Sequence, residues 1–272
     1  MMETKIPEKV YKYRDWSNGF HRNILLHNEL YLASPREFND PFDFRIPMNF
    51  IDQTPEERNI YINDLAISHF YKSEEKGLNF KKQIEILEGR ITNDKSFQTN
   101  MEDYYFDLLN KHYGILSIST KWNEILLWSH YVNQHKGFCV GFWEDKLRES
   151  TPFVSRTGLV DYPPEFPIIK PIVEKTEEQR RQRISRQTTT KSKDWEYEGE
   201  YRFVKCFYPE EPKTYQRLMN FQDNCISEII MGISIPTEAR DEIIQICKIK
   251  NIPVYQAKKF PFKFAIDREL IE

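Results

Sequence analysis

The sequence predicts an α+β fold with a single core. The chain has 272 residues, of which 39% are hydrophobic and 14% aromatic, so it can bury one sizeable core, and global disorder is excluded. Short segments with strand-like patterning lie on both sides of a long segment with helical spacing. Length alone does not require a second domain, so we expect residues 1–272 to form a single domain.

The first elements follow from the spacing of apolar residues. We expect residues 8–14 to form a short strand, residues 20–28 a helix, and residues 29–34 a second strand. A turn is predicted next, because Asn39 and Asp40 can bond their own backbone and the residue before a proline avoids the helical region. Three aromatic residues should pin this turn to the core: Phe38, Phe42 and Phe44.

A helical insertion is expected over residues 52–112. This stretch is rich in Glu and Lys, and its apolar residues are spaced as on surface helices, which fits two or three helices. A strand over residues 114–120 follows. It carries Ser117 and Ser119 on one face, since alternate residues of a strand share a face.

A helix over residues 122–135 comes next, ended by Gly137 as a C-cap, and then a strongly apolar strand over residues 137–143. Residues 174–194 are polar and basic and predict a helix with a mobile loop. The alternation after this loop predicts a strand over residues 195–208. The remaining segments predict two further strands, at residues 225–232 and 253–260, around a helix that opens at Pro236.

The expected location is the cytoplasm. No stretch reaches the roughly 20 apolar residues of a membrane span, and the N-terminal residues are charged where a signal peptide is apolar. We therefore expect no membrane partner. The net charge of −3 does not describe a generic nucleic-acid binder, so such a contact would need a local patch. The four cysteines form no CxxC pair and are expected to be buried thiols: Cys139, Cys206, Cys225 and Cys247.

Three glutamates alternate along the strand predicted at residues 195–208. Glu196, Glu198 and Glu200 would project from one face, where like charges oppose folding unless water or a ligand receives them. They form either a solvated face or a site in which Glu200 accepts a hydrogen bond from a sugar hydroxyl or stabilises a developing cation. Arg202 follows on the same face and could be the internal partner of Glu200.

Two other groups could contribute to a site. Arg14 ends its strand, where it is either an exposed charge or a clamp for a phosphate or carboxylate. Trp128 and Tyr131 share a helix face, whereas His130 is rotated away from them. These aromatic residues either pack in the core or form a shelf on which a flat ring stacks.

Several enzyme signatures are absent. The chain has no GxGxxG, GxxxxGK[ST], HExxH or GxSxG motif, and its six histidines show no metal-binding spacing beyond one weak i, i+5 pair. Dinucleotide binding by a Rossmann turn, P-loop chemistry and metal catalysis are therefore disfavoured.

In order along the chain, these blocks resemble a family of bacterial proteins known chiefly as a domain of unknown function. The family's recurring elements are YKYR near the start, an FNDPFD turn, an S-x-S strand followed by LWSHY and GFCVGF, and a closing E-x-EYR. The resemblance covers residues 10–262 and implies membership without an activity.

A more distant similarity is to the ADP-ribosyltransferases. That family has a first strand bearing His or Arg, then a strand that enters a helix with Ser and Tyr, and a closing strand with a catalytic Glu. Here the same order is given by Arg14, the segment GILSISTKWNEILLWSHY and the E-x-E motif at residues 198–200. The resemblance implies small, split mixed or antiparallel sheets around a central cleft, flanked by helices.

It also implies that NAD is the substrate and that no metal takes part. Glu200 would hold the ribose 2′-hydroxyl and stabilise an oxocarbenium-like transition state. Arg14 would lie on the phosphates or the nicotinamide ribose, and Trp128 or Tyr131 would stack on nicotinamide. The implied catalytic residues are Glu200, Glu198 and Arg14. The implied NAD-binding residues are Arg14, Ser117, Ser119, Trp128, His130, Tyr131 and Arg202.

Three functions follow as alternatives. The first is an NAD-dependent ADP-ribosyltransferase or NAD glycohydrolase, as a bacterial toxin or antiphage effector, whose acceptor is a nucleic acid or a protein that meets the basic loop at residues 180–193. The second is a non-catalytic module that binds a nucleotide or nucleic acid. The third is a structural protein that binds a partner and keeps its aromatic blocks in the core.

Overall fold

The structure is a computed structural model that describes residues 6–69, 79–93, 96–150 and 156–271. The chain divides into two compact units. The first unit comprises Met1–Phe38, Lys111–Tyr162 and Lys193–Glu272, and the second comprises Asn39–Asn110 and Pro163–Ser192. The expectation of a single domain concerns how the whole chain folds and stays a prediction.

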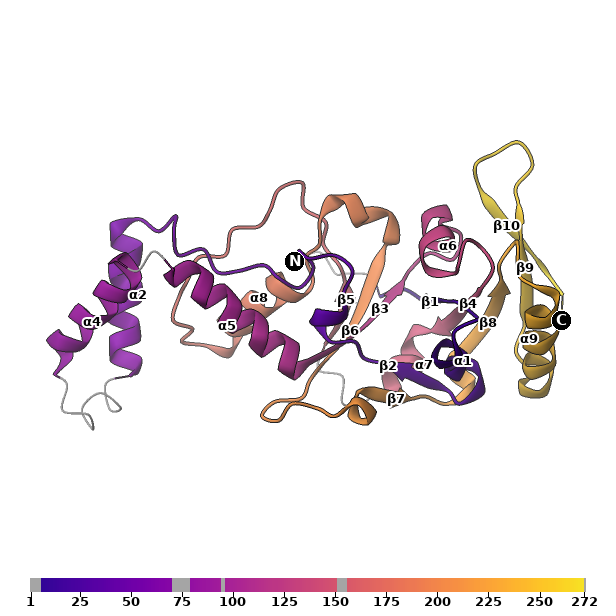
Figure 1. Ribbon diagram of the computed structural model, residues 1–272, viewed down its shortest axis with the longest axis horizontal. Helices are drawn as coiled ribbons and strands as arrows, with labels where there is room; N and C mark the ends of the chain where they lie inside the picture. The colour runs from indigo at the N-terminus through magenta and orange to yellow at the C-terminus, as the bar shows by residue number, and fades with distance from the viewer. Residues whose placement is uncertain (1–5, 70–78, 94–95, 151–155, 272) are drawn as a thin grey trace. The chain divides into compact units, whose positions relative to one another are not determined.

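An eight-stranded sheet forms the centre of the first unit (Figure 1). Its strands are β1 (Lys9–Arg14), β3 (Tyr113–Ser119), β4 (Phe138–Trp143), β5 (Arg156–Leu159), β6 (Glu200–Cys206), β8 (Ile226–Met231), β9 (Val254–Lys259) and β10 (Ile266–Leu270). They lie in the order β10-β9-β8-β4-β1-β3-β6-β5, and all neighbours are antiparallel except β8 and β9. A two-stranded sheet pairs β2 (Glu29–Tyr31) with β7 (Leu218–Asn220). The α+β class with a mostly antiparallel sheet is therefore confirmed.

The eight-stranded sheet has a narrow seam between β1 and β3. Pairing of β1 with β4 runs along the whole of β1, whereas β1 and β3, both fully described, pair at one position, Tyr11↔Ser119. Beside that position, the Lys12 ammonium donates a hydrogen bond to the backbone carbonyl of Ser117. The resemblance implied small, split sheets. The structure instead has two halves of one sheet, because this single pair keeps them continuous.

Helices cover both faces of the sheet. The helices of this unit are α1 (Gly19–Leu26), α6 (Ile125–Tyr131), α7 (Glu144–Glu149) and α9 (Thr237–Lys250). Buried side chains of α1, α7 and α9 join one core, which includes Phe138 of β4 and Phe203 of β6. On the other face α6 packs Trp128 against Tyr13, with ring centroids 5.3 Å apart. Since neighbouring residues of a strand point to opposite faces, these two cores define the faces of the side chains in β1, β3, β4 and β6.

The regular elements described in the second unit are helices. They are α2 (Pro55–Ser68), α4 (Phe80–Asn93), α5 (Phe97–His112) and α8 (Glu177–Thr188). The first three confirm the helices predicted over residues 52–112, and α8 confirms the helix predicted in the basic segment. A small core of this unit contains Met48, Tyr61 and Ile169.

The helix predicted over residues 122–135 is shorter than expected. It ends at Tyr131, and three residues in the left-handed region follow it: Asn133, Gln134 and His135. Gly137 lies after them and does not cap the helix. A Cβ at Gly137 would be 2.2 Å from the backbone oxygen of Arg14, so this glycine permits the close approach of two strands' ends.

Two burial predictions were wrong in part. Phe44 is fully buried, but Phe42 is 65% exposed and does not pin the turn. Cys139, Cys225 and Cys247 are buried thiols, whereas Cys206 is exposed. Cys206 is the last residue of β6, where the strand leaves the core.

Candidate functional site

The E-x-E motif lies where a 3-10 helix turns into a strand. The helix η2 (Lys193–Glu198) ends at the first glutamate of the motif, and β6 begins at the second, Glu200. Between them, Gly199 has a φ of 50°, in the region that favours glycine. The sequence predicted one strand with three glutamates on one face. This was wrong for Glu196 and Glu198, which both lie in the 3-10 helix, and Glu196 is exposed to solvent.

Glu200 forms a bidentate ion pair with Arg202. The guanidinium donates from Nε to one carboxylate oxygen at 2.7 Å and from Nη2 to the other at 3.0 Å. Arg202 is fully buried and Glu200 is 4% exposed. The predicted pairing of these two residues is confirmed. It fixes the orientation of the carboxylate and keeps its charge compensated.

Glu198 has a different environment. Its side chain is 5% exposed, and one of its oxygens accepts a hydrogen bond from the Tyr131 hydroxyl at 2.7 Å. Tyr131 is the last residue of α6, so this bond joins the helix to the E-x-E motif. Two carboxylates separated by one residue are thus both buried, one held by an arginine and one by a tyrosine.

Polar side chains from the neighbouring strand and loops hold the turn in place. The Ser119 hydroxyl donates to the backbone oxygen of Glu198 at 2.5 Å and accepts from the backbone N–H of Lys121 at 2.9 Å. The Lys121 ammonium donates to the backbone oxygen of Tyr197 at 2.9 Å. Ser119 therefore positions the backbone of the motif.

Tyr162 completes this frame. Its hydroxyl accepts a hydrogen bond from the backbone N–H of Glu200 at 2.9 Å. Burial raises the pKa of Tyr162, so the hydroxyl is protonated at neutral pH. Sequence reasoning missed Tyr162 and Lys121. Tyr162 lies in no motif, Lys121 lies in the block at residues 114–131 without a role assigned to it, and both reach Glu200 or its turn from distant parts of the chain.

An aromatic shelf borders the motif, formed by His130, Tyr131, Trp195 and Tyr197. Tyr197 and His130 contact each other through the hydroxyl and Nδ1 at 3.3 Å, and the rings of Trp195 and Tyr197 are 6.0 Å apart. Trp128 does not belong to this shelf, contrary to the stacking role the resemblance implied. Trp128 is fully buried, and its Nε1–H donates a hydrogen bond to the backbone oxygen of Trp122 at 2.7 Å.

Arg14 lies on the other face of the sheet from this site. Arg14 is paired with Phe138 across β1 and β4, so both side chains lie on the same face of the sheet. Tyr201 of β6 joins the same core as Phe138. Glu200, the residue before Tyr201 on β6, therefore points to the opposite face. The Arg14 guanidinium donates to the backbone oxygen of Tyr13 at 3.4 Å, and burial lowers its pKa to about 10. The structure therefore does not bring Arg14 and Glu200 together.

Ser117 is the cross-strand neighbour of Arg202 and lies on the same face as the site. The residues that the structure brings together at the E-x-E motif are Ser117, Ser119, His130, Tyr131, Glu198, Glu200 and Arg202. Arg14 and Trp128 are the two predicted residues that it places elsewhere.

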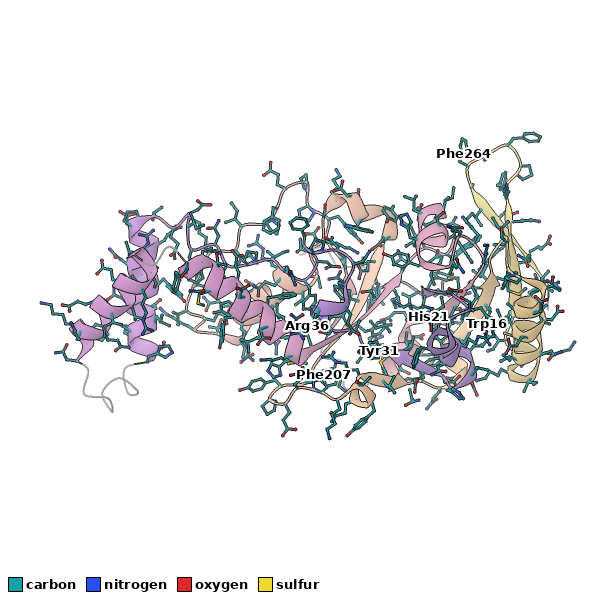
Figure 2. All side chains as sticks on the ribbon, in the orientation of Figure 1. Trp16, His21, Tyr31, Arg36, Phe207 and Phe264 are labelled. Atoms are coloured by element: carbon teal, nitrogen blue, oxygen red, sulfur yellow. The ribbon has the colours of Figure 1, made fainter. Side chains whose placement is uncertain are left out.

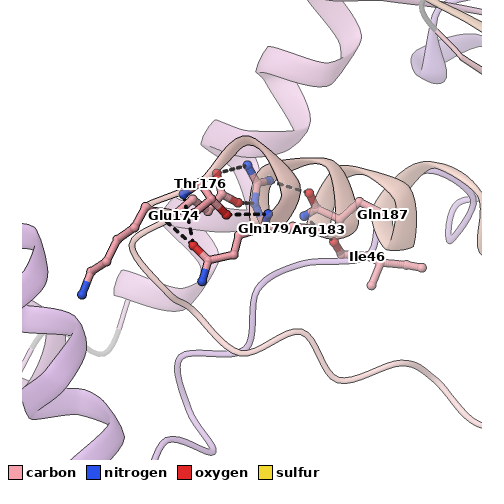
Figure 3. Close-up of polar contacts among 7 residues, drawn as sticks. Ile46, Glu174, Thr176, Gln179, Arg183 and Gln187 are labelled. Carbon is pink, nitrogen blue, oxygen red and sulfur yellow. Dashed lines mark hydrogen bonds and ion pairs between the residues drawn. The ribbon is translucent and has the colours of Figure 1, made fainter.

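The basic segment of the second unit is held by internal contacts (Figure 3). Arg183 of α8 forms an ion pair with Glu174 and donates from Nη1 to the Gln187 side chain at 2.7 Å, and Gln187 donates to the backbone oxygen of Ile46 at 3.0 Å. A capping box at Thr176 starts the helix. Part of the positive charge predicted to meet an acceptor, that of Arg183, is therefore engaged within the unit.

The loop after α8 was predicted to be mobile. Residues 189–191 of this loop are buried, and its mobility stays a prediction. At its end, the Lys191 ammonium lies 3.6 Å from the carboxylate of Asp43, and both side chains are 5% exposed. The exposed basic residues between positions 174 and 194 are Lys175, Arg180, Arg181, Arg186 and Lys193.

The described residues contain neither a cluster of metal-ligating side chains nor a membrane-spanning helix. In that part of the chain, no group of three or more His, Cys, Asp or Glu side chains is placed to hold a metal ion. Nor does any helix there combine the length and apolar character needed to cross a bilayer. The described residues do contain an open pocket of about 500 Å³, lined by Glu8, Trp143, Lys146 and neighbouring residues, and none of the predicted site residues lines it.

Residues 127–203 match the sequence profile of a family described as "Protein of unknown function (DUF2971)". This match begins within α6 and ends within β6, so it contains Tyr131, both motif glutamates and Arg202. No curated protein and no solved structure matches the chain significantly.

Proposed function

We propose that the protein is an NAD-dependent ADP-ribosyltransferase or NAD glycohydrolase whose reaction centre is the E-x-E turn. The observation that carries the proposal is the Tyr131–Glu198 hydrogen bond. It fixes an aromatic shelf next to two buried carboxylates, which is the combination that a flat cationic ring attached to a sugar requires.

The chemistry needs a preplaced negative charge. The bond between C1′ of the ribose and the nicotinamide nitrogen breaks, and its electron pair leaves with the nicotinamide, which becomes neutral. Positive charge develops on the sugar and is stabilised by a carboxylate already in position. The oxygen of water or of an acceptor then bonds to C1′ and loses its proton.

The two carboxylates suit different parts of this reaction. Arg202 fixes the Glu200 carboxylate, so this carboxylate can accept a hydrogen bond from a ribose hydroxyl without changing its orientation. The Glu198 carboxylate accepts a hydrogen bond from Tyr131, which belongs to the aromatic shelf. In this proposal Glu198 is therefore the carboxylate closer to a nicotinamide ring stacked on the shelf. Arg14 takes no part in this proposal, because its side chain leaves the sheet on the other face.

The arrangement of the sheet supports the resemblance to the ADP-ribosyltransferases. In that family, the arginine, serine and glutamate blocks come from three separate strands around a cleft between two sheets. Here the strands that carry Arg14, Ser119 and Glu200 are neighbours, in the order β1-β3-β6. The sheet also narrows to one residue pair between the first two. The acceptor and a toxin or antiphage role remain predictions from the resemblance.

Nicotinamide release from NAD tests the proposal. The wild type, Glu198→Gln and Glu200→Gln should be incubated with NAD and the products separated by chromatography. We expect each substitution to lower turnover by at least about 100-fold, the effect of removing one electrostatic contact to a transition state. Glu196→Gln is the matched control, because it removes the same charge from an exposed glutamate of the same 3-10 helix.

Folding must be checked in parallel, because Glu200→Gln leaves Arg202 buried beside a neutral partner. Thermal melting of each variant separates lost chemistry from lost structure. Glu198→Gln supplies a second result at a different carboxylate, which accepts a hydrogen bond from the uncharged Tyr131 hydroxyl. Release of nicotinamide at wild-type rates by both glutamine variants would remove the assigned roles. NAD binding without any release would leave the non-catalytic nucleotide-binding alternative.

A further inference from the structure

The hairpin between β9 and β10 ends in exposed aromatic side chains. Phe262 and Phe264 have relative exposures of 107% and 103%, so neither ring is covered by protein. Phe260, at the base of the tip, is 39% exposed. Figure 2 shows Phe264 at the end of the hairpin, beyond the paired strands. Adjacent exposed apolar side chains of this size mark a surface that contacts something else.

The tip is ordered by its own backbone. Pairing of the two strands runs from Leu270↔Tyr255 to Ile266↔Lys259. Beyond the last pair, the N–H of Phe260 donates to the oxygen of Ala265 at 2.9 Å, and the N–H of Ala265 donates to the oxygen of Lys263 at 2.9 Å. Presenting the rings therefore requires little further ordering of the chain.

Positive charge surrounds the rings. The segment from 258 to 264 has the sequence KKFPFKF, with three lysines and no acidic residue. The Lys263 ammonium lies 5.0 Å from the centroid of the Phe260 ring. Lys258 forms an ion pair with Glu269 on β10 at 3.1 Å, which leaves Lys259 and Lys263 as the main charges of the tip.

We propose that this hairpin docks the protein onto a membrane surface that contains anionic lipids. Phe262 and Phe264 enter the layer between headgroups and acyl chains, and Lys259 and Lys263 lie beside the lipid phosphates. The sequence-based expectation of no membrane partner depended on the lack of a spanning segment, and a surface contact of this kind needs none.

The shape and charge of the tip favour lipid over the other candidates. The rings project from the end of a hairpin, whereas single-stranded nucleic acid is bound by grooves that track its backbone. A convex tip enters a soft layer without requiring a matching hollow. The lysines complement anionic headgroups, each of which adds attraction near the surface.

Sedimentation with lipid vesicles tests this inference. The full chain should be mixed with vesicles of phosphatidylcholine alone or with added phosphatidylglycerol, and the bound fraction measured. We expect the partition coefficient to be at least about tenfold higher on the anionic vesicles. Phe262→Ser with Phe264→Ser should lower it by at least about tenfold, because the two rings provide the buried apolar area.

Phe20→Ser is the matched control. Phe20 is 88% exposed on α1, away from the hairpin, so its loss should leave vesicle binding unchanged. Lys259→Gln with Lys263→Gln gives a second test that keeps the rings, and should remove most of the difference between the two vesicle types. All these side chains are exposed, and circular dichroism checks that each variant is folded.

The inference is overturned if the wild type does not bind anionic vesicles, or if the two serine substitutions leave binding unchanged. Tighter binding of a single-stranded oligonucleotide than of vesicles, lost in the same variants, would replace the membrane by nucleic acid. None of these outcomes depends on NAD turnover.

Discussion

Glu200 and Glu228 lie at the two ends of one row of residues that crosses the sheet. The row runs through Glu228, Gly141, Tyr11, Ser119 and Glu200, each paired with the next across neighbouring strands. Both glutamates are almost inaccessible to water, at 2% and 4% exposure. By burial alone, they are equivalent.

Their partners come from different distances along the chain. Glu228 accepts hydrogen bonds from three side chains of other strands: Lys9 at 3.2 Å, Tyr11 at 3.1 Å and Arg268 at 2.8 Å. It therefore joins β8 to β1 and β10. Glu200 is paired with Arg202, two residues along the same strand.

The difference teaches that a buried carboxylate is not by itself a sign of a site. Glu228 connects strands that are far apart in the sequence, which is a structural role. The Glu200–Arg202 ion pair lies within β6, and the Arg202 guanidinium also lies 5.7 Å from the centroid of the Phe38 ring. Its surroundings contain a second buried carboxylate and partly exposed aromatic residues. The difference in partners, together with the neighbouring carboxylate and aromatic residues, makes Glu200 the better candidate for chemistry.

The largest expected effect tests whether the Glu200–Arg202 pair is self-contained. Arg202→Met should destabilise the protein by about 3 to 5 kcal/mol, because it leaves a carboxylate buried without its partner. Glu200→Met combined with Arg202→Met should recover most of that loss, to within about 1 kcal/mol of the wild type, because both charges are gone. Urea unfolding measures both. Glu200→Met alone should be measured as well. If the loss of stability in the double variant equals the sum of the losses in the two single variants, each residue holds other parts of the fold.

Glu228→Gln should have a smaller effect that depends on pH. We expect a loss of about 2 to 3 kcal/mol at pH 7, because Lys9 and Arg268 are partly exposed and water compensates some of their charge. Burial would raise the pKa of Glu228, but the hydrogen bond and charge of Arg268, followed by those of Lys9, lower it below its usual value of 4.5. The stabilisation is thus complete above about pH 4.5 and is lost as the pH falls through the lowered pKa.

Unfolding of the wild type and Glu228→Gln at a series of acidic pH values would show this dependence. The difference between them should shrink steadily below pH 4.5. A difference that stays constant down to pH 3 would mean that the ionised carboxylate does not provide the stabilisation.

The smallest expected effect concerns His21. Its contribution to the loss of stability at acidic pH must be measured separately from that of Glu228. Burial, together with the charges of Arg14 and Lys12, lowers the pKa of His21 to about 4. Between its ordinary pKa of 6.5 and about 4, the unfolded chain binds a proton that the folded one does not, so stability falls as the pH falls. His21→Gln should reduce that loss by on the order of 1 kcal/mol, given the partial exposure of the ring. An unchanged slope between pH 6.5 and 4 in this variant would contradict the assignment.

The strands of the sheet were predictable where their patterns are unambiguous. The apolar run at residues 137–143 and the alternation at residues 8–14 became β4 and β1. The Glu200–Arg202 pair also followed from alternation, because residues two apart on a strand share a face. Local patterns were sufficient in these cases, since the contacts involved are local.

The start of the E-x-E motif could not be assigned from its pattern. The segment WEYEGEY alternates as a strand does, yet its first half is a 3-10 helix, and the backbone of Gly199 is what breaks the alternation. The face of Arg14 relative to Glu200 was equally hidden. It depends on the pairing Tyr11↔Ser119 and Ser119↔Glu200, which joins residues far apart in the chain.

Trp128 illustrates a third limit. Helical spacing correctly placed it on a face with Tyr131, but spacing does not tell a core residue from one at the edge of a cleft. Its contact with Tyr13 of β1 decides the matter, and that contact is tertiary.

The seam at Tyr11↔Ser119 has a consequence for hydrogen exchange in β1. Successive amide protons of a strand point alternately to its two neighbours, so half of those in β1 face β4, where pairing is complete, and half face β3, where it is confined to one position. Deuterium uptake along this one strand should therefore alternate between slow and fast residues, since amides without a ladder partner open more readily.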